Sequence, residues 1–247
     1  MKSVLITGTN RGIGLGLVKS LLASKNVPQR IIATCRKPAE AKELQEISEK
    51  NSNVHIVQFD LNDFQSYPSL SENVKHLVGD DGLNVLINNA GIAGKFLKIG
   101  YLKADAMLEC FKINTVAPTI LTKEFIPLLK QAANKNSNEP LGAKRAAVIN
   151  ITSILGSIAS NDAGGYYPYR CSKSALNAAT KSLCLDLKDY KILVACIHPG
   201  WVKTDMGGAK APLEVSSSCE SLVKTISNLS QDHNGAFLNY DGEPLPW

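Results

Sequence analysis

Short runs of β-branched and aliphatic residues alternate along this chain with segments of helical hydrophobic spacing, and this alternation restricts the fold most strongly. Several runs are apolar without interruption, such as Val4-Leu5-Ile6 and Ile192-Leu193-Val194-Ala195. Such runs are typical of strands that helices cover on both faces of a parallel sheet. The pattern predicts one α/β domain over residues 1–247, a Rossmann fold with a doubly wound, seven-stranded parallel sheet. Strands are expected at residues 3–7, 30–35, 54–59, 85–88, 146–151, 192–197 and 236–239.

The composition indicates an ordinary globular protein of the cytoplasm. The 247 residues are 44% hydrophobic and 20% charged, and the net charge of +5 is spread along the chain without a basic run that would suggest a nucleic-acid partner. No apolar stretch approaches the roughly 20 residues of a membrane-spanning helix, and the first residues do not have the pattern of a secretory signal. The six cysteines are far apart and lack a C-x-x-C pair, so we expect reduced core thiols. The four histidines form no ligand-spaced cluster, and no metal site is predicted.

A glycine-rich turn follows the first predicted strand and precedes a helical pattern. Its sequence is Thr7-Gly8-Thr9-Asn10-Arg11-Gly12-Ile13-Gly14. Gly8 allows a sharp turn, while Gly12 and Gly14 keep side chains away from backbone amides at a helix N-terminus, where a pyrophosphate can bind. The turn therefore predicts a dinucleotide cofactor held by Gly8, Asn10, Arg11, Gly12, Ile13 and Gly14.

The residues after the second strand indicate which dinucleotide is preferred. A carboxylate at this position would bind the free ribose hydroxyls of NAD, but here the strand ends in Cys35-Arg36-Lys37. The Arg36 guanidinium favours the 2′-phosphate of NADP(H), and Arg11 in the glycine turn offers a second positive charge. The alternative is that Arg36 and Lys37 are solvated loop charges.

Two further strand ends are expected on the same edge of the sheet. Asp60, followed by Leu61, offers a carboxylate to the adenine amino group after the third strand. The small-residue turn Asn88-Asn89-Ala90-Gly91 follows the fourth strand and lets backbone lie against the cofactor. We expect cofactor contacts from Asp60, Leu61, Asn88, Ala90 and Gly91, although each segment alone could be a plain loop.

A tyrosine and a lysine four residues apart open a predicted helix, as Tyr169 and Lys173. This spacing places both side chains on one helix face. An ammonium group beside the phenol would lower its pKa from about 10, which would make the phenol a usable acid or base. Tyr166 and Tyr167 are followed four residues later by arginine and cysteine, so Tyr169 is the favoured residue.

Two more polar candidates precede this helix. Ser153 stands at the end of the fifth strand, where its hydroxyl could hold a substrate oxygen, and Ser157 is the second candidate for this role. Asn114 is polar within an otherwise apolar helical pattern. Its amide could anchor a water that links Lys173 to solvent, or it could mark a kink in the helix.

With these motifs in place, the chain resembles the short-chain dehydrogenase/reductase family over essentially its whole length, and it is most similar to the sniffer-type, NADPH-dependent carbonyl reductases of animals. The resemblance implies a catalytic tetrad of Asn114, Ser153, Tyr169 and Lys173, with Tyr169 and Lys173 also touching the cofactor. It also implies nicotinamide contacts from the segment His198-Pro199-Gly200-Trp201-Val202-Lys203-Thr204, through Pro199, Gly200, Val202 and Thr204.

The same resemblance implies hydride transfer from NADPH to a carbonyl substrate such as an aldehyde, ketone or quinone, and thus removal of reactive carbonyls under oxidative stress. Two alternatives are an alcohol dehydrogenase for one defined metabolite, such as a steroid or fatty acyl group, and a dinucleotide-binding sensor with vestigial catalytic residues. The family usually forms dimers or tetramers through the helices that follow strands four and five, and we expect a homodimer.

Three segments carry structural expectations. Residues 205–216 contain Gly207 and Gly208 and are expected to form a mobile substrate lid. The interval of 16 residues from Ser153 to Tyr169 is a few longer than usual in the family, so residues 159–166 should form an enlarged loop at the mouth of the site. The tail after Asp241 should fold back over an apolar surface.

Overall fold

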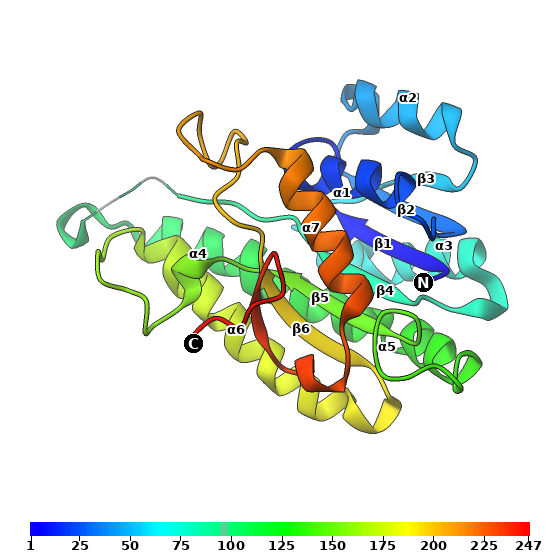
Figure 1. The fold of residues 1–247 in the computed structure, drawn as a ribbon. Helices are drawn as coiled ribbons and strands as arrows, with labels where there is room; N and C mark the ends of the chain where they lie inside the picture. Colours follow the sequence, from blue (N-terminus) through cyan, green and yellow to red (C-terminus); the bar gives the residue numbers. More distant parts are fainter. Residues whose placement is uncertain (95, 97) are drawn as a thin grey trace.

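The chain folds around one seven-stranded sheet in which every neighbouring pair of strands is parallel (Figure 1). The computed structural model describes residues 1–94, 96 and 98–247. The strand order β3-β2-β1-β4-β5-β6-β7 confirms the predicted doubly wound Rossmann architecture. Each observed strand starts and ends within one residue of its expected range. The strands are β1 (Ser3–Thr7), β2 (Arg30–Cys35), β3 (Val54–Gln58), β4 (Val85–Asn88), β5 (Ala147–Ile151), β6 (Leu193–His198) and β7 (Phe237–Asn239).

Helices cover both faces of the sheet and bury its continuous apolar runs. One core lies between the sheet and the pair α1 and α7, which pack against each other, while α3, α5 and α6 close a second core on the opposite face (Figure 1). The main helices are α1 (Gly12–Leu22), α2 (Lys42–Lys50), α3 (Tyr67–Val78), α4 (Ala104–Phe111), α5 (Ala117–Lys135), α6 (Tyr167–Leu187) and α7 (Val215–Asn228). Within the described residues, no helix has both the length and the apolar character needed to cross a membrane.

The winding of the sheet reverses between β1 and β4, which are hydrogen-bonded neighbours. The chain moves outward to β2 and β3 on one side of this boundary and to β5, β6 and β7 on the other. In such sheets a ligand binds in the crevice beyond the carboxyl ends of the strands at the reversal. The glycine turn after β1 and the small-residue turn after β4 both lie at that edge.

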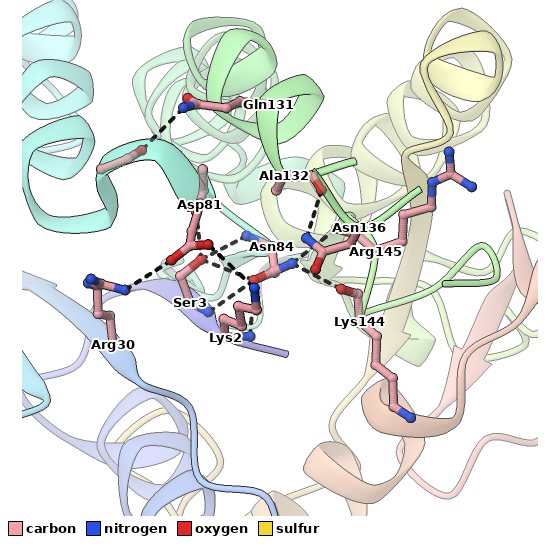
Figure 2. A network of polar contacts seen from close by, with 12 residues as sticks. Lys2, Ser3, Arg30, Asp81, Asn84, Gln131, Ala132, Asn136, Lys144 and Arg145 are labelled. Atoms are coloured by element: carbon pink, nitrogen blue, oxygen red, sulfur yellow. Dashed lines mark hydrogen bonds and ion pairs between the residues drawn. The ribbon is translucent and has the colours of Figure 1, made fainter. Parts of the chain in front are cut away.

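At the other end of the strands, where β1 and β4 begin, the chain is held together by the buried side-chain amide of Asn84 (Figure 2). Its Oδ1 accepts hydrogen bonds from the backbone N–H groups of Lys2 and Ser3, at 3.0 and 3.2 Å. Its Nδ2 donates to the carbonyl oxygens of Lys144 and Arg145, each at 3.0 Å. One side chain thereby joins the start of β1, the start of β4 and the approach to β5.

The cysteines and the tail agree with the expectations from the sequence. None of the six cysteines forms a disulfide, and all but the partly buried Cys171 are buried. The tail after Asp241 turns back along β7, and the Trp247 ring packs on Phe237 with 5.5 Å between ring centroids.

Replacing the Asn84 amide should cost more than one ordinary hydrogen bond, because four backbone groups at the start of β1 and before β5 lose their partner. We expect Asn84→Ala to lower the free energy of unfolding by about 3 kcal/mol, as measured by urea denaturation. Gln131→Ala, which removes one exposed side-chain bond to the Gly79 carbonyl, is the control and should change the value by less than about 0.5 kcal/mol. Equal effects of the two substitutions would contradict this role of Asn84.

Candidate active site

The glycine turn has the backbone conformation that its sequence predicts. Gly8 and Gly12 have φ of +72° and +56°, in the region that side chains disfavour. A Cβ added at Gly14 would lie 2.0 Å from the Gly8 carbonyl oxygen, so only glycine fits there. The carbonyl oxygen of Thr34 in β2 accepts hydrogen bonds from the Gly8 and Thr9 amides, each at 3.0 Å. The turn is thus held at the start of α1 by the neighbouring strand.

Two residues outside the predicted site, Thr7 at the end of β1 and Asn89 after β4, hold the glycine turn against the turn that follows β4. The Thr7 hydroxyl accepts hydrogen bonds from the Asn89 and Ala90 amides, at 3.0 and 3.1 Å. The Asn89 side chain donates to the carbonyl oxygens of Thr7 and Gly8, at 2.8 and 3.3 Å. The only available signal was their place beside the glycines in two motifs, because the bonds connect residues 82 positions apart.

The charged residues expected around the cofactor lie at the carboxyl edge in different states. Arg36 is exposed and forms no ion pair with any residue that the structure describes. Arg11 forms an ion pair with Asp205, so its charge is partly neutralised.

The other expected cofactor contacts differ in exposure. Asp60 accepts a hydrogen bond from the Asn62 amide at 2.9 Å and, like Leu61, is partly exposed after β3. Asn10 is exposed beside Arg11, whereas Ile13 is partly buried at the start of α1.

The side chain of Asn88 turns away from the cofactor edge. Its Nδ2 donates to Asn150 Oδ1 at 2.8 Å and to the Thr122 hydroxyl at 3.1 Å, and the whole group is buried. Asn150 continues this buried chain to the Thr180 hydroxyl at 2.9 Å. Any cofactor contact expected from Asn88 therefore falls to its backbone and to the following residues Ala90 and Gly91.

Tyr169, Lys173 and Ser153 come together where β5 meets α6. The Lys173 ammonium donates to the carbonyl oxygen of Ile151, the last residue of β5, at 2.8 Å. It lies 5.9 Å from the centroid of the Tyr169 ring. Ser153 caps the 3-10 turn Ile154–Gly156, where its hydroxyl accepts the Leu155 amide at 3.1 Å, and it lies near enough to Tyr169 to influence the pKa of the phenol.

The pKa of the phenol moves opposite to the direction expected from a neighbouring ammonium. Burial raises the pKa of Tyr169 to about 12, although the nearby Ser153 hydroxyl partly offsets this rise. Burial also lowers the pKa of Lys173 to about 8, so this ammonium group loses its proton more readily than an exposed lysine does. The phenol consequently stays protonated at neutral pH, as a proton donor must.

Asn114 lies beside this pair, in a π-helical turn between α4 and α5 (Lys112–Val116). Its Oδ1 accepts the Ile92 amide at 2.9 Å, and its Nδ2 donates to the Ile92 carbonyl at 2.8 Å and to the Ser172 hydroxyl at 3.0 Å. The expected helix distortion is present, and the amide ties the turn after β4 to α6. A Cβ added at Gly91 would lie 3.1 Å from Asn114 Oδ1 and 3.6 Å from Lys173 Nζ.

The two candidate serines differ in what they bind. Ser157 is buried, and its hydroxyl donates to the Trp247 carbonyl oxygen at 3.2 Å and accepts the Ser160 amide at 3.0 Å. Ser153 instead stands just beyond the end of β5 near Tyr169, and its hydroxyl partly offsets the rise that burial causes in the pKa of the phenol. The geometry therefore favours Ser153 as the serine that meets a reacting oxygen.

The segment after β6 closes the crevice from the other side. A Cβ added at Gly12 would lie 3.5 Å from the Thr204 side chain, so this segment borders the glycine turn. Val202 is buried and bridges to Leu213, while the Pro199 carbonyl accepts the Ser218 hydroxyl at 2.6 Å. Gly200 has φ of +84°. The predicted lid, residues 205–216, extends into α7, which begins at Val215, and the loop 205–213 before it is anchored at both ends beside the crevice.

Close contacts of small residues connect the two halves of the site. A Cβ added at Gly8 would lie 2.8 Å from the Ala90 Cβ, and Gly91 in turn borders Asn114 and Lys173. A dinucleotide held at the glycine turn would thus extend toward the phenol of Tyr169. This arrangement can bind a dinucleotide and give a proton to an oxygen at its far end.

His198, at the end of β6, provides a test of burial near this crevice. Burial lowers the pKa of His198 to about 4 from 6.5, so the unfolded chain binds more protons than the folded one between these values. Stability should therefore fall as the pH drops through this window. We expect wild type to lose on the order of 2 kcal/mol more than His198→Gln between pH 7 and pH 5.

Denaturant unfolding at the two pH values measures this difference, and His76→Gln, which removes an exposed ring, is the control. An identical loss of stability in wild type and His198→Gln would show that the His198 ring is not neutralised by burial.

Comparison with known proteins agrees with this geometry. The family model described as short chain dehydrogenase matches residues 2–214. The carbonyl reductase Sniffer of D. melanogaster is 52% identical, with full coverage of both chains and a TM-score of 0.99. An NADPH-bound carbonyl reductase from chicken fatty liver is 42% identical over all of this chain and 94% of its own, with a TM-score of 0.96. The C-signal protein of Myxococcus xanthus is 38% identical over 165 residues, which are 67% of this chain and 93% of that protein. The chain therefore belongs to the short-chain dehydrogenase family.

Proposed function

We propose that this protein is an NADPH-dependent carbonyl reductase. The observation that carries the proposal is the buried Lys173 ammonium, which is held on the last carbonyl oxygen of β5 and lies 5.9 Å from the Tyr169 ring, next to Ser153 and at the edge where the glycine turn opens. The likeness to Sniffer and to the chicken carbonyl reductase supports the same activity. The phenol is protonated at neutral pH and can therefore supply the proton that the product alcohol needs.

The proposed catalytic residues are Asn114, Ser153, Tyr169 and Lys173. The Ser153 hydroxyl orients the carbonyl oxygen, and the Tyr169 phenol gives it a proton as negative charge develops. NADPH, when bound, supplies the hydride that adds to the carbonyl carbon. Lys173 would hold the cofactor ribose, and Asn114 holds the turn after β4 against α6. Proton and hydride together convert the carbonyl into an alcohol.

The residues around the crevice fit this cofactor. The positive-φ glycines and the crowded Gly14 leave the amides at the start of α1 open to a pyrophosphate. The exposed Arg36 suits the 2′-phosphate, and Arg11 joins it if its ion pair with Asp205 opens. The other proposed contacts are Gly8, Asn10, Gly12, Ile13, Asp60, Leu61, the backbone of Asn88, Ala90, Gly91, Tyr169, Lys173, Pro199, Gly200, Val202 and Thr204.

We further propose apolar aldehydes, ketones and quinones as substrates, and removal of reactive carbonyls as the role. The loop 205–213 would act as a lid, with Gly207 and Gly208 as hinges. An alcohol dehydrogenase for one metabolite would be favoured by a preference for NAD, which the exposed Arg36 opposes. A vestigial sensor is disfavoured because the residues that the chemistry needs are all present and adjacent.

A homodimer in the cytosol completes the proposal. Large apolar side chains are exposed on the helices that follow β4 and β5, namely Leu108, Val116, Ile120 and Leu185. Contact between two copies along these helices would cover them. A molar mass measured by light scattering tests the dimer, and a value near the 26.6 kDa of one chain would contradict it.

The proton donor is tested by Tyr169→Phe, which removes one oxygen and keeps the ring. We expect turnover of a quinone with NADPH to fall by about 10²- to 10⁴-fold, while the Kd for NADPH, followed by fluorescence, stays within about twofold because the ring remains. Tyr167→Phe is the matched control and should keep its activity. Turnover retained in Tyr169→Phe would remove this phenol from the reaction.

Cofactor choice is tested by Arg36→Ala. Loss of a charge-assisted contact to the 2′-phosphate should reduce kcat/KM for NADPH by about 10- to 100-fold, with little change for NADH. Lys37→Ala, at an exposed lysine already paired with Glu40, is the control. An unchanged ratio of the two kcat/KM values in Arg36→Ala would mean that Arg36 is a solvated loop charge.

A further inference from the structure

The residues after β7 form a strap that ends on the loop following Ser153. Beyond the turn at Gly242, the Leu245 amide donates to the Phe237 carbonyl at 2.8 Å and Pro244 bridges to Leu238 in antiparallel sense. The Trp247 ring packs on the buried Phe237 ring. The strap is therefore fixed to the edge strand of the sheet by backbone bonds and by an aromatic contact.

The far end of the strap holds the backbone on both sides of Ile158. The Trp247 carbonyl oxygen accepts the Ala159 amide at 2.8 Å and the Ser157 hydroxyl at 3.2 Å. The Ser157 hydroxyl also accepts the Ser160 amide at 3.0 Å. Ile158 itself is 78% exposed, more than any other large apolar side chain that the structure describes. Two bonds to one oxygen thus fix the segment Ser157 to Ser160 while its apolar side chain stays in solvent.

This segment begins the loop that connects Ser153 to Tyr169, the two residues that meet the reacting oxygen. Ser153 does not need the strap, because it caps its own 3-10 turn, and the Gly156 carbonyl is held by the Ser174 hydroxyl of α6 at 2.8 Å. The strap therefore acts on the part of the loop beyond the reacting groups. An apolar side chain presented there is suited to the non-reacting part of a substrate.

We propose that Trp247 is a positioning residue that fixes residues 157–160 as a wall of the substrate site, and that Ile158 on this wall contacts the apolar body of bulky carbonyl substrates. This inference rests on the proposed reductase function and assigns a specificity role that the reacting groups do not supply. It separates substrate choice, set by the strap and the wall, from proton transfer, set by Ser153 and Tyr169.

The test compares a bulky and a small substrate, 9,10-phenanthrenequinone and propanal, in Ile158→Ala, Trp247→Ala and Trp247→Phe. We expect KM for the quinone to rise about 5- to 10-fold in the two alanine variants, with kcat, KM for propanal and Kd for NADPH all within about twofold. Trp247→Phe, which keeps an aromatic ring on Phe237, should restore the quinone KM. Tyr190→Ala, at an exposed aromatic residue beyond the end of α6, is the control.

Hydrogen exchange gives a second readout that does not need turnover. The Ala159 amide should exchange faster in Trp247→Ala than in wild type, and Trp247→Phe should restore its protection. An unchanged quinone KM in a folded Trp247→Ala protein, or an equal rise in KM for both substrates, would contradict the proposal that residues 157–160 form a wall of the substrate site. Unchanged exchange at the Ala159 amide would contradict the proposal that Trp247 fixes this segment. Wild type that reduces neither compound would instead refute the proposed function, while the exchange result would still decide whether Trp247 fixes the loop.

Discussion

The buried ammonium of Lys173, held on the carbonyl oxygen that ends β5, is the contact around which the candidate site is arranged. It fixes the start of α6 to the carboxyl end of the sheet, and Tyr169 lies on the same helix face one turn earlier. Burying a charge is costly, and its lowered pKa of about 8 reports that cost. The parallel register places this strand end level with the ends of β1 and β4, where a dinucleotide would lie.

Small residues make the rest of the arrangement possible. Gly8 packs against Ala90, and Gly91 packs against Asn114 and Lys173, so two turns and one helix come within contact distance without side chains between them. A larger residue at any of these positions would push the cofactor side of the crevice away from the phenol. Polar side chains such as Thr7, Asn89 and Asn114 then lock the same turns with hydrogen bonds.

Most of the fold could be predicted from the sequence, because each strand is a short apolar run bounded by turn residues and each signal is local. The pairing of Tyr169 with Lys173 was equally accessible, since helical spacing alone places them together. The features that were not predicted depend on distant partners. Asn88 stands at the end of its strand as expected, but which face its side chain takes depends on Asn150 and Thr122.

The same dependence on distant residues explains why the pKa of Tyr169 and the ion pair of Arg11 were not predicted. The expected lowering of the phenol pKa considered only the nearest ammonium, whereas burial, which depends on the whole packed site, has the larger effect. Arg11 was assigned to the cofactor without knowledge that Asp205, 194 residues later, would pair with it. The contact of Trp247 with the loop after Ser153 likewise spans 90 residues. None of these partners can be identified from local spacing.

The most direct test of the central claim follows the hydride itself. Wild-type protein is incubated with a ketone and NADPH carrying deuterium at the transferable position of nicotinamide C4, and the alcohol is examined by mass spectrometry and NMR. If the crevice brings the nicotinamide and the carbonyl together beside Tyr169, the alcohol gains one deuterium on the former carbonyl carbon. An alcohol without deuterium at that carbon, or no alcohol at all, would contradict the account.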